Sequence, residues 1–382
     1  MATDHDRFFM DIAARSALRA IGRVEPNPMV GCVLSREGRI LAVGHHRVHG
    51  ELHAERDAIA SCRAAGHDPR GSTAHVTLEP CNGVGNQPPC VEALIEAGIT
   101  RVVYAVRDPN PAKAGGGDRL RSHGVIVDQL GGHPLAHRLS APFRQLLSDE
   151  LPWVTAKWAQ TIDGRIATRD GESKWISSPA ARRRVHRFRS RIDAVLTGVG
   201  TVLADNPMLT ARAEDGARRV RRRACRVVID SRLSTPLSSA LVESAGTYRT
   251  IIVTTPGDEA WARRRESLTR AGIDVLDVPP NPDGKADLRQ ALAALARQRE
   301  LSTILVEAGP RLLGGLLLAS LVNEAIVHLA PMILADEHAR PCATGREAPL
   351  LSGASRWRLD RVKRIGPDVE LWYSRDDRHG RQ

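Results

Sequence analysis

The sequence predicts a two-domain α/β protein. Its 382 residues are enough for two hydrophobic cores, because single domains usually span about 100–200 residues. In both halves, short apolar segments typical of strands alternate with segments of helical periodicity, a pattern that favours sheets covered by helices. A less regular stretch with three prolines, residues 131–152, separates the halves. We therefore expect domains over residues 1–148 and 149–376, with the boundary near Asp149–Pro152, and a polar tail over 377–382.

The first half supplies the elements of one sheet and its covering helices. Residues 6–21 have apolar positions at helical spacing. Further helices are predicted at His53–Ala65 and Val91–Ala97, each followed by a glycine that ends it. The predicted strands are Val30–Leu34, Ile40–Val43, Ala74–Leu78, Val102–Val106 and Val125–Val127.

The second half repeats the alternation. Its predicted strands are Trp153–Ala159, Ala194–Thr197, Arg226–Ile229, Thr250–Val253, Val275–Val278, Thr303–Glu307 and Ala325–Ala330. Helical patterns lie between them at Ala180–Arg189, Glu259–Ala271, Asp287–Arg297 and Arg311–Ala319. Strands separated by helices indicate a second α/β domain.

Composition excludes several classes of partner. Aromatic residues make up only 3% of the chain, so we do not expect a base-stacking surface for nucleic acid. No apolar run approaches the roughly 18 residues of a membrane span, and the N-terminus lacks the pattern of a signal peptide. We therefore expect a cytoplasmic protein that binds no membrane. The six cysteines are scattered along the chain, which favours reduced thiols or metal ligands over disulfides.

The net charge of +11 comes almost entirely from arginine. Much of it lies in the runs Arg182–Arg184, Arg218–Arg223 and Arg263–Arg265. Such runs are usually solvated faces. They also suit a phosphorylated substrate or a nucleic-acid surface.

One constellation in the first half carries chemistry. His53-Ala54-Glu55 is followed by Pro80-Cys81 and then by Pro89-Cys90. A catalytic zinc ion takes about three protein ligands and leaves one position for water, and one histidine with two cysteines meets that number. A carboxylate two residues from the histidine can carry protons without binding the metal. The pattern is the signature of zinc-dependent deaminases, with His53, Cys81 and Cys90 as metal ligands and Glu55 as the catalytic residue.

The placement of these residues supports the same interpretation. His53 and Cys90 would each begin a helix, where the partial positive charge of the helix N-terminus stabilises thiolates. The alternatives are a closed structural zinc site or two unrelated buried thiols. A closed site needs a fourth ligand, and only three obvious ligands are present.

Read with their neighbours, these residues resemble the bifunctional riboflavin-biosynthesis deaminase/reductase family. In the first half the resemblance rests on Pro26–Gly31, His46–Glu55, Thr77–Cys81, Pro88–Cys90 and Asp108–Pro111. It implies a cytidine-deaminase-like α/β/α sandwich that binds Zn²⁺. It also implies that Asn27, His46, Asp108 and Asn110 bind the pyrimidine and its ribose phosphate.

In the second half the resemblance rests on Lys157–Ala167, Gly171–Pro179, Thr197–Arg212, Val228–Ser231 and Val306–Pro310. It implies a dihydrofolate-reductase-like α/β domain that uses NADPH. The implied cofactor-binding residues are Ala159, Trp175, Thr201, Asp205, Ser231, Gly309, Pro310, Arg311, Leu312, Leu313, Gly314 and Gly315. The implied substrate-binding residues are Ser173, Arg189, Leu209, Arg212 and Glu307. Arg182–Arg184 or Arg232 are candidates to hold the 2′-phosphate of NADPH. Members of this family form homo-oligomers, so we expect one here.

The chain departs from the family pattern around the pyrimidine pocket. Gly83 stands where the family usually has a histidine, Asn86 where it has a basic residue and Gln87 where it has a threonine. Gly116 replaces an arginine, and Lys113 is a candidate to compensate for the lost charge. We therefore expect a competent metal centre with altered substrate recognition.

The function implied is deamination of a phosphorylated pyrimidine followed by NADPH-dependent reduction of its ribosyl group. One alternative keeps the reductase but makes the first domain a diverged deaminase or a scaffold, and the loop over residues 82–87 motivates it. Another is a protein that edits or binds nucleic acid, suggested by the net charge of +11. The scarcity of aromatic residues and the reductase motifs count against that alternative.

Overall fold

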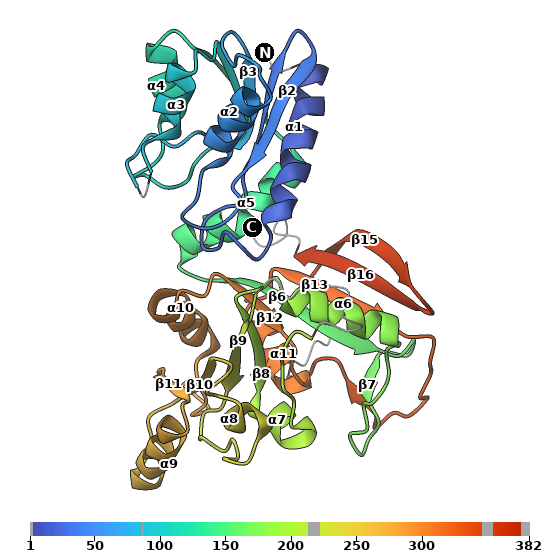
Figure 1. Cartoon of the computed structure of the whole chain (residues 1–382). Coiled ribbons are helices and arrows are strands. Elements are labelled where there is room, and N and C mark those ends of the chain that lie inside the picture. The colour runs from blue at the N-terminus through green and yellow to red at the C-terminus, as the bar shows by residue number, and fades with distance from the viewer. Residues whose placement is uncertain (1–2, 86, 213–221, 346–353, 376–382) are drawn as a thin grey trace. The chain divides into compact units, whose positions relative to one another are not determined.

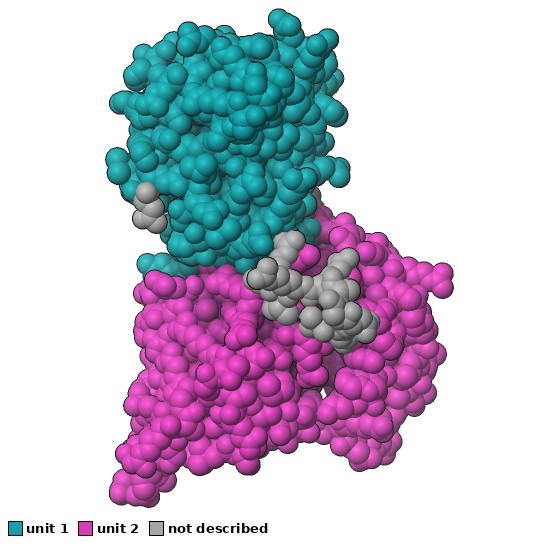
Figure 2. Space-filling view, in the orientation of Figure 1, with its two compact units in different colours: residues 1–150 teal, residues 151–382 magenta. Residues whose placement is uncertain are grey.

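The computed structural model describes residues 3–85, 87–212, 222–345 and 354–375. The chain forms two compact units, unit 1 (Met1–Glu150) and unit 2 (Leu151–Gln382) (Figure 2). The expected polar tail lies outside the described residues, as do residues 218–221 of the second arginine run. Within the described ranges, no helix has the length and apolar character needed to cross a membrane.

Unit 1 is built on a five-stranded sheet with the order β2-β1-β3-β4-β5. Strand β1 is antiparallel to β2 and β3, whereas β3, β4 and β5 run parallel. The strands are β1 (Gly31–Arg36), β2 (Arg39–His45), β3 (Thr73–Leu78), β4 (Arg101–Val106) and β5 (Ile126–Gln129). Because β3 and β4 are parallel neighbours, the segments that follow them leave the sheet at the same edge.

Helices cover both faces of this sheet (Figure 1). They are α1 (Asp4–Ala17), a 3₁₀ turn η1 (Leu18–Ala20), α2 (Ala54–Ala64), α3 (Cys90–Glu96), α4 (Gly116–Ser122) and α5 (Pro134–Asp149). Helices α2 and α3 bury Ala58 and Leu94 against Val76 of β3. On the opposite face, Met10 of α1 and Ala136 of α5 pack around Val103 of β4. The expected α/β/α sandwich is confirmed.

Helix α5 corrects the expectation of a less regular segment over residues 131–152. Pro134 occupies the first turn of the helix, where a missing N–H is no loss. Pro142 lies inside the helix, a position that sequence reasoning treats as a helix breaker. Burial of Ala136 and Leu139 outweighs that local cost, so the segment is helical up to Asp149.

Unit 2 is built on a nine-stranded sheet with the order β11-β10-β9-β8-β12-β6-β13-β16-β15. The first seven strands in this order run parallel, and β16 and β15 complete the edge as an antiparallel hairpin. The strands are β6 (Trp153–Gln160), β8 (Ala194–Gly198), β9 (Cys225–Ile229), β10 (Thr250–Thr254), β11 (Asp274–Asp277), β12 (Thr303–Val306), β13 (Glu324–Leu329), β15 (Trp357–Ile365) and β16 (Asp368–Arg375). A separate pair joins β7 (Arg165–Ala167) to β14 (Arg340–Pro341).

The final hairpin is absent from the strands predicted by the sequence. Residues 358–364 of β15 are all exposed, and five of these seven residues are charged. The segment therefore lacks the apolar alternation by which a half-buried strand is recognised.

Helices also cover both faces of the second sheet. They are α6 (Pro179–Arg189), α7 (Val199–Asp205), α8 (Ala240–Glu243), α9 (Glu259–Arg270), α10 (Leu288–Arg299) and α11 (Pro310–Leu318). Helices α10 and α11 pack against one face through Leu295 and Leu316. Val202 of α7 and Leu268 of α9 pack against the other face, and Phe188 of α6 contacts Trp372 of β16 at a ring-centroid distance of 5.5 Å.

Candidate active sites

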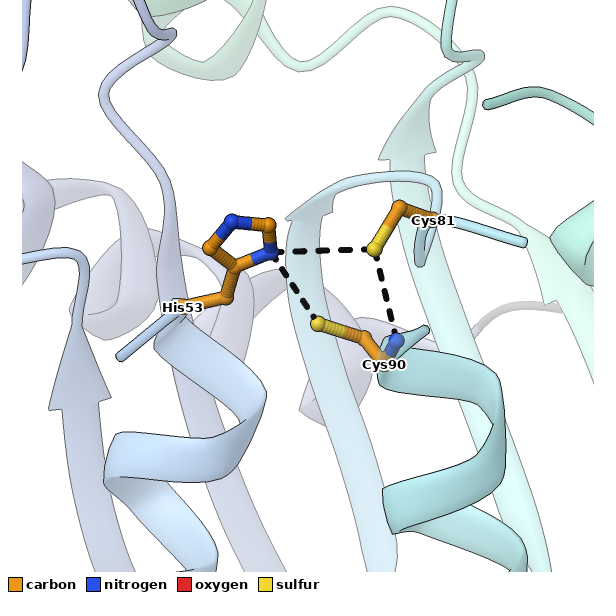
Figure 3. A group of neighbouring side chains, drawn as sticks. All are labelled: His53, Cys81 and Cys90. Atoms are coloured by element: carbon orange, nitrogen blue, oxygen red, sulfur yellow. Dashed lines mark hydrogen bonds between the residues drawn. The ribbon is translucent and has the colours of Figure 1, made fainter. Parts of the chain in front are cut away.

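Three potential metal ligands converge at the edge of the unit 1 sheet (Figure 3). His53 is the residue that caps the N-terminus of α2, Cys90 is the first residue of α3, and Cys81 follows the end of β3. His53 Nδ1 lies 3.6 Å from Cys81 Sγ and 3.3 Å from Cys90 Sγ. The donor atoms of these three residues all lie within 4.8 Å of one another.

These distances fit a zinc ion. Zinc binds cysteine sulfur at about 2.3 Å and histidine nitrogen at about 2.0 Å with tetrahedral geometry, which places N and S ligands about 3.5 Å apart. The two N–S distances in the structure bracket that value. Among the described residues no other cluster of histidine, cysteine and acidic side chains has this proximity, so a fourth coordination position would be left for water.

The electrostatics of the group favour a thiolate at Cys81. Hydrogen bonding to Cys90 and His53 lowers the pKa of Cys81 to about 4, although burial opposes the shift. Cys90 also donates its backbone N–H to Cys81 Sγ at 3.3 Å. Glu55 is 3% exposed, and its burial, with the nearby charge of Cys81, raises its pKa to about 7. Such a carboxyl group can hold or release a proton near neutral pH.

Asn27 and His46 lie beside the metal ligands. The His46 and His53 rings meet edge to face, with their centroids 5.4 Å apart. His46 Nδ1 lies 3.0 Å from the Leu52 carbonyl oxygen, which can only accept, so Nδ1 carries the hydrogen. His46 Nε2 is then the acceptor for the Asn27 side-chain amide at 3.4 Å. Burial lowers the pKa of His46, in keeping with a neutral ring.

The segment that follows β4 brings Asp108 and Asn110 to the same edge of the sheet. Glu79 Oε2 accepts the Asp108 backbone N–H at 3.2 Å, and Glu79 Oε1 accepts that of Gly117 at 3.0 Å. Asp108 Oδ1 in turn accepts the Asn110 N–H at 2.9 Å. Burial raises the pKa of Asp108 to about 6. A buried glutamate thus fixes both ends of the 108–117 segment next to the metal ligands.

In unit 2, the predicted cofactor residues collect at the C-terminal edge of the parallel strands. Ala159 lies at the end of β6, Thr201 and Asp205 lie on α7 directly after β8, and Ser231 follows β9. Gly309 caps α11 directly after β12. A methyl group built at Gly309 would lie 3.8 Å from Thr201 Oγ1, so the turns after β8 and β12 are neighbours. This edge is where open α/β sheets bind ligands.

Two of the predicted substrate residues bind each other. Arg189 at the end of α6 donates to both carboxylate oxygens of Glu307, at 2.7 and 2.9 Å, and to the Thr210 carbonyl oxygen at 3.1 Å. Both side chains are 15% exposed. Burial lowers the pKa of Lys157, whereas the charge of Glu307 opposes that shift. Lys157 lies on β6, and Glu307 directly follows β12, the neighbouring strand.

Models of two protein families match the chain. The cytidine and deoxycytidylate deaminase zinc-binding region matches residues 3–106, and the RibD C-terminal domain matches residues 152–371. The riboflavin biosynthesis protein RibD of Actinobacillus pleuropneumoniae is 38% identical over 97% of this chain and 95% of its own length. That of Escherichia coli (strain K12) is 37% identical over 96% and 98%, respectively.

The chain belongs to the RibD family. Solved structures agree: form 1 of Acinetobacter baumannii RibD has a TM-score of 0.84 at 32% identity, covering 97% of this chain and 99% of that one. The Thermotoga maritima deaminase/reductase has a TM-score of 0.81 at 31% identity, with the same coverage. The protein is therefore an enzyme with a deaminase domain followed by a reductase domain, and the resemblance stated from the sequence is confirmed.

Against the RibD family pattern, Gly116 has a local structural explanation. A Cβ atom at this position would lie 1.8 Å from the Pro80 carbonyl oxygen. The start of α4 therefore approaches the residue before Cys81 too closely for any side chain. Loss of the arginine expected at position 116 thus accompanies a close approach between two backbone segments of the site.

Lys113 contacts the loop between the two cysteines. Its Nζ donates to the Gly83 carbonyl oxygen at 3.2 Å and to that of Val84. These bonds direct the ammonium group to the loop backbone, whereas the sequence suggests a compensating charge for the substrate. Asn86, the other altered position of interest, lies outside the described residues.

The remaining predicted cofactor- and substrate-binding residues of the RibD-type reductase domain range from buried to exposed. Trp175 is 65% exposed, and the Arg182 guanidinium lies 4.3 Å from its ring centroid. In the Gly309–Gly315 turn, Leu313 and Gly314 are buried and Arg311 is exposed. Ser173 is half-buried, Leu209 is buried and Arg212 is exposed. The Leu313 side chain is part of the core, which leaves only its backbone groups for binding a ligand.

Sequence reasoning missed a second charged cluster next to this site. Glu370 of β16 is fully buried and accepts two hydrogen bonds from Arg184 of α6, at 2.8 and 2.6 Å. It also accepts from Trp372 Nε1 at 2.9 Å and lies 3.3 Å from His328 Nε2. The Arg184 guanidinium, one of the candidates for the cofactor phosphate, is thus bound to a carboxylate of the sheet. No local signal connects residues 186 positions apart.

Proposed function

We propose that this RibD-family enzyme catalyses two consecutive steps of riboflavin biosynthesis. Unit 1 hydrolytically deaminates 2,5-diamino-6-ribosylamino-4(3H)-pyrimidinone 5′-phosphate, taking up water and releasing ammonia. Unit 2 then uses NADPH to reduce the ribosyl group to ribityl. The observation that carries the proposal is the set of His53, Cys81 and Cys90 donor atoms beside buried Glu55.

In unit 1 each residue has a distinct task. His53, Cys81 and Cys90 would hold the zinc ion, which when bound lowers the pKa of a coordinated water. Glu55 lies in the first turn of α2, two residues after His53. It would carry protons from the water to the ring and to the leaving amine. The substrate-binding residues that we propose are Asn27, His46, Asp108 and Asn110.

In unit 2 we propose that the C-terminal edge of the sheet binds NADPH, which supplies the hydride when bound. The residues for the cofactor are Ala159, Trp175, Thr201, Asp205, Ser231 and the Gly309–Gly315 turn. The residues for the substrate are Ser173, Arg189, Leu209, Arg212 and Glu307. These residues would hold the sugar carbon against the cofactor. Lys157, Asp205 and Glu307 are the polar candidates for this positioning.

The test is to assay the two half-reactions separately on purified, zinc-replete protein. We expect ammonia release from the diaminopyrimidine phosphate and NADPH oxidation with the deaminated product. Reduction without deamination would instead support the diverged-deaminase alternative. Absence of both reactions would contradict the proposal as a whole. Light scattering on the same sample measures whether the expected homo-oligomer forms.

A further inference from the structure

The loop between the two zinc-binding cysteines is described over residues 82–85 and 87–89, and each of these two segments binds a cation. At its end, Arg56 of α2 donates to the carbonyl oxygens of Pro88 and Pro89, at 3.1 and 3.0 Å. At its start, Lys113 donates to the carbonyl oxygens of Gly83 and Val84. Both cations bind backbone carbonyl oxygens. They therefore constrain the backbone path of the loop and make no contact with its side chains through these bonds.

Lys113 belongs to the segment that also carries Asp108 and Asn110. Its backbone is fixed there, because its N–H donates to the Asn110 carbonyl oxygen at 2.8 Å. Its own carbonyl oxygen accepts the Asn82 N–H at 2.8 Å. Lys113 thus joins the two segments through both its backbone and its side chain.

The 108–117 segment is itself held at both ends by hydrogen bonds. Glu79, 7% exposed, accepts the backbone N–H groups of Asp108 and Gly117 at the two ends of the segment. A continuous set of bonds therefore runs from the end of β3 through Glu79 to Lys113 and on to the loop. Gly83 shows how closely the two segments fit, because a Cβ atom there would lie 2.0 Å from the Ala112 carbonyl oxygen.

We propose that Lys113 is a positioning residue of the deaminase. It fixes the start of the Cys81–Cys90 loop relative to Asp108 and Asn110, and so sets the width of the pocket that accepts the pyrimidine phosphate. The proposal rests on the proposed function. It assigns Lys113 an action through the loop backbone and no direct contact with the substrate.

The test is the variant Lys113→Met, which keeps the length of the side chain and removes its donors. We expect the deaminase KM to rise about ten-fold, the equivalent of roughly one charge-assisted hydrogen bond, while kcat and the reductase activity are retained. We also expect zinc to pass several-fold faster to a chromogenic chelator, because both ends of the loop carry ligands. Lys113→Arg should restore most of the KM, and the exposed Lys285→Met in unit 2 is the matched control.

A second variant separates positioning from charge. Gly83→Ala keeps the ammonium group but forces the loop away from Ala112, so it should raise the deaminase KM in the same direction. A normal KM in Lys113→Met would overturn the proposal. So would a raised KM in Lys113→Met with a normal KM in Gly83→Ala, since that pair of results makes Lys113 a direct substrate contact.

The zinc-release measurement keeps the two proposals distinguishable. If the unmodified enzyme fails to deaminate the pyrimidine phosphate, the proposed function is wrong. The chelator kinetics of Lys113→Met still decide whether Lys113 fixes the loop, and an unchanged release rate would then contradict the positioning role.

Discussion

The two units fasten helices to their sheets with buried carboxylates, but they place these carboxylates differently with respect to their sites. In unit 1, Asp6 of α1 binds His75 Nε2 at 2.9 Å and Arg101 at 2.7 and 3.0 Å. Phe9 of the same helix packs on His75, on the face of the sheet opposite α2 and α3. The residues that hold α1 are therefore separate from the metal ligands.

In unit 2 one helix serves both purposes. Helix α6 is held by two acidic residues of β16 and by one that directly follows β12. Asp368 accepts the Ser178 N–H at 2.8 Å, Glu370 pairs with Arg184, and Glu307 pairs with Arg189. Arg189 and Glu307 are also proposed substrate residues. Damage to structural ion pairs should consequently spare the deaminase in unit 1 and impair the reductase in unit 2.

The largest expected effect removes the proton carrier of unit 1. Glu55→Gln should lower the deamination rate by about 10²–10⁴-fold, the usual contribution of a general acid–base group. Zinc content and NADPH oxidation should stay at the level of the unmodified enzyme. The exposed Glu51→Gln is the control, and deamination that persists in Glu55→Gln would show that another group moves the protons.

The next effect breaks the shared ion pair of unit 2. Glu307→Gln removes both charge-assisted bonds from Arg189, each worth about 1.5–3 kcal/mol, and leaves a largely enclosed cation, 15% exposed, without its anionic partner. We expect the reductase kcat/KM to fall about hundred-fold, the equivalent of roughly 2.7 kcal/mol. The deaminase activity measured on the same sample should not change, and an equal loss of both activities would contradict the separation of the two sites.

Glu370→Gln should lower the stability of unit 2 by about 3 kcal/mol, the usual cost of breaking a buried pair. Because all six tryptophans lie in unit 2, their fluorescence during denaturant unfolding reports on this unit alone. A several-fold rise in the reductase KM should accompany the loss, since α6 carries Arg189.

Glu370→Gln should also change how the stability of unit 2 depends on pH. Burial raises the pKa of Glu370, but hydrogen bonds from His328, Arg184 and Trp372 outweigh it and hold the pKa well below its usual range. In the unfolded chain the carboxyl group of Glu370 has the ordinary glutamate pKa of about 4.3, so as the pH falls it binds a proton there before it does in the folded state. The stabilisation is therefore present above that pH and is lost on acidification. The difference in unfolding free energy between the native chain and Glu370→Gln should shrink between pH 6 and pH 3, and parallel curves would refute this account.

The smallest effect on function is expected for Asp6→Asn. It removes the charge that binds Arg101 and His75 and should destabilise unit 1 by about 2 kcal/mol. Faster backbone hydrogen exchange in peptides from α1 and β3 is the measurement. Deamination should stay normal, whereas Glu370→Gln should impair the reductase. A loss of deamination in Asp6→Asn would contradict the separation of structural ion pairs from the site in unit 1.

The sequence predicted the elements whose signals are local. Apolar alternation and the glycines after helices located most strands and helices of both sheets. Helix α5 and the final hairpin were missed for different reasons. Burial of Ala136 and Leu139 offsets Pro142 in α5. Residues 358–364 of β15 are exposed, and this strand forms by pairing with β16, which in turn pairs with β13.

The residue types that bind metal are likewise evident from the sequence, since few side chains ligate zinc and their spacing at helix starts is characteristic. The sequence by itself thus predicted the metal ligands His53, Cys81 and Cys90 and the proton carrier Glu55, and the structure brings the three potential ligands together. Only the tertiary structure decided the partners of the charged residues: Lys113 with the loop, Arg184 with Glu370, and Arg189 with Glu307. A charged side chain is compatible with many partners, and the one it binds is selected by burial and by the approach of segments far apart in the chain.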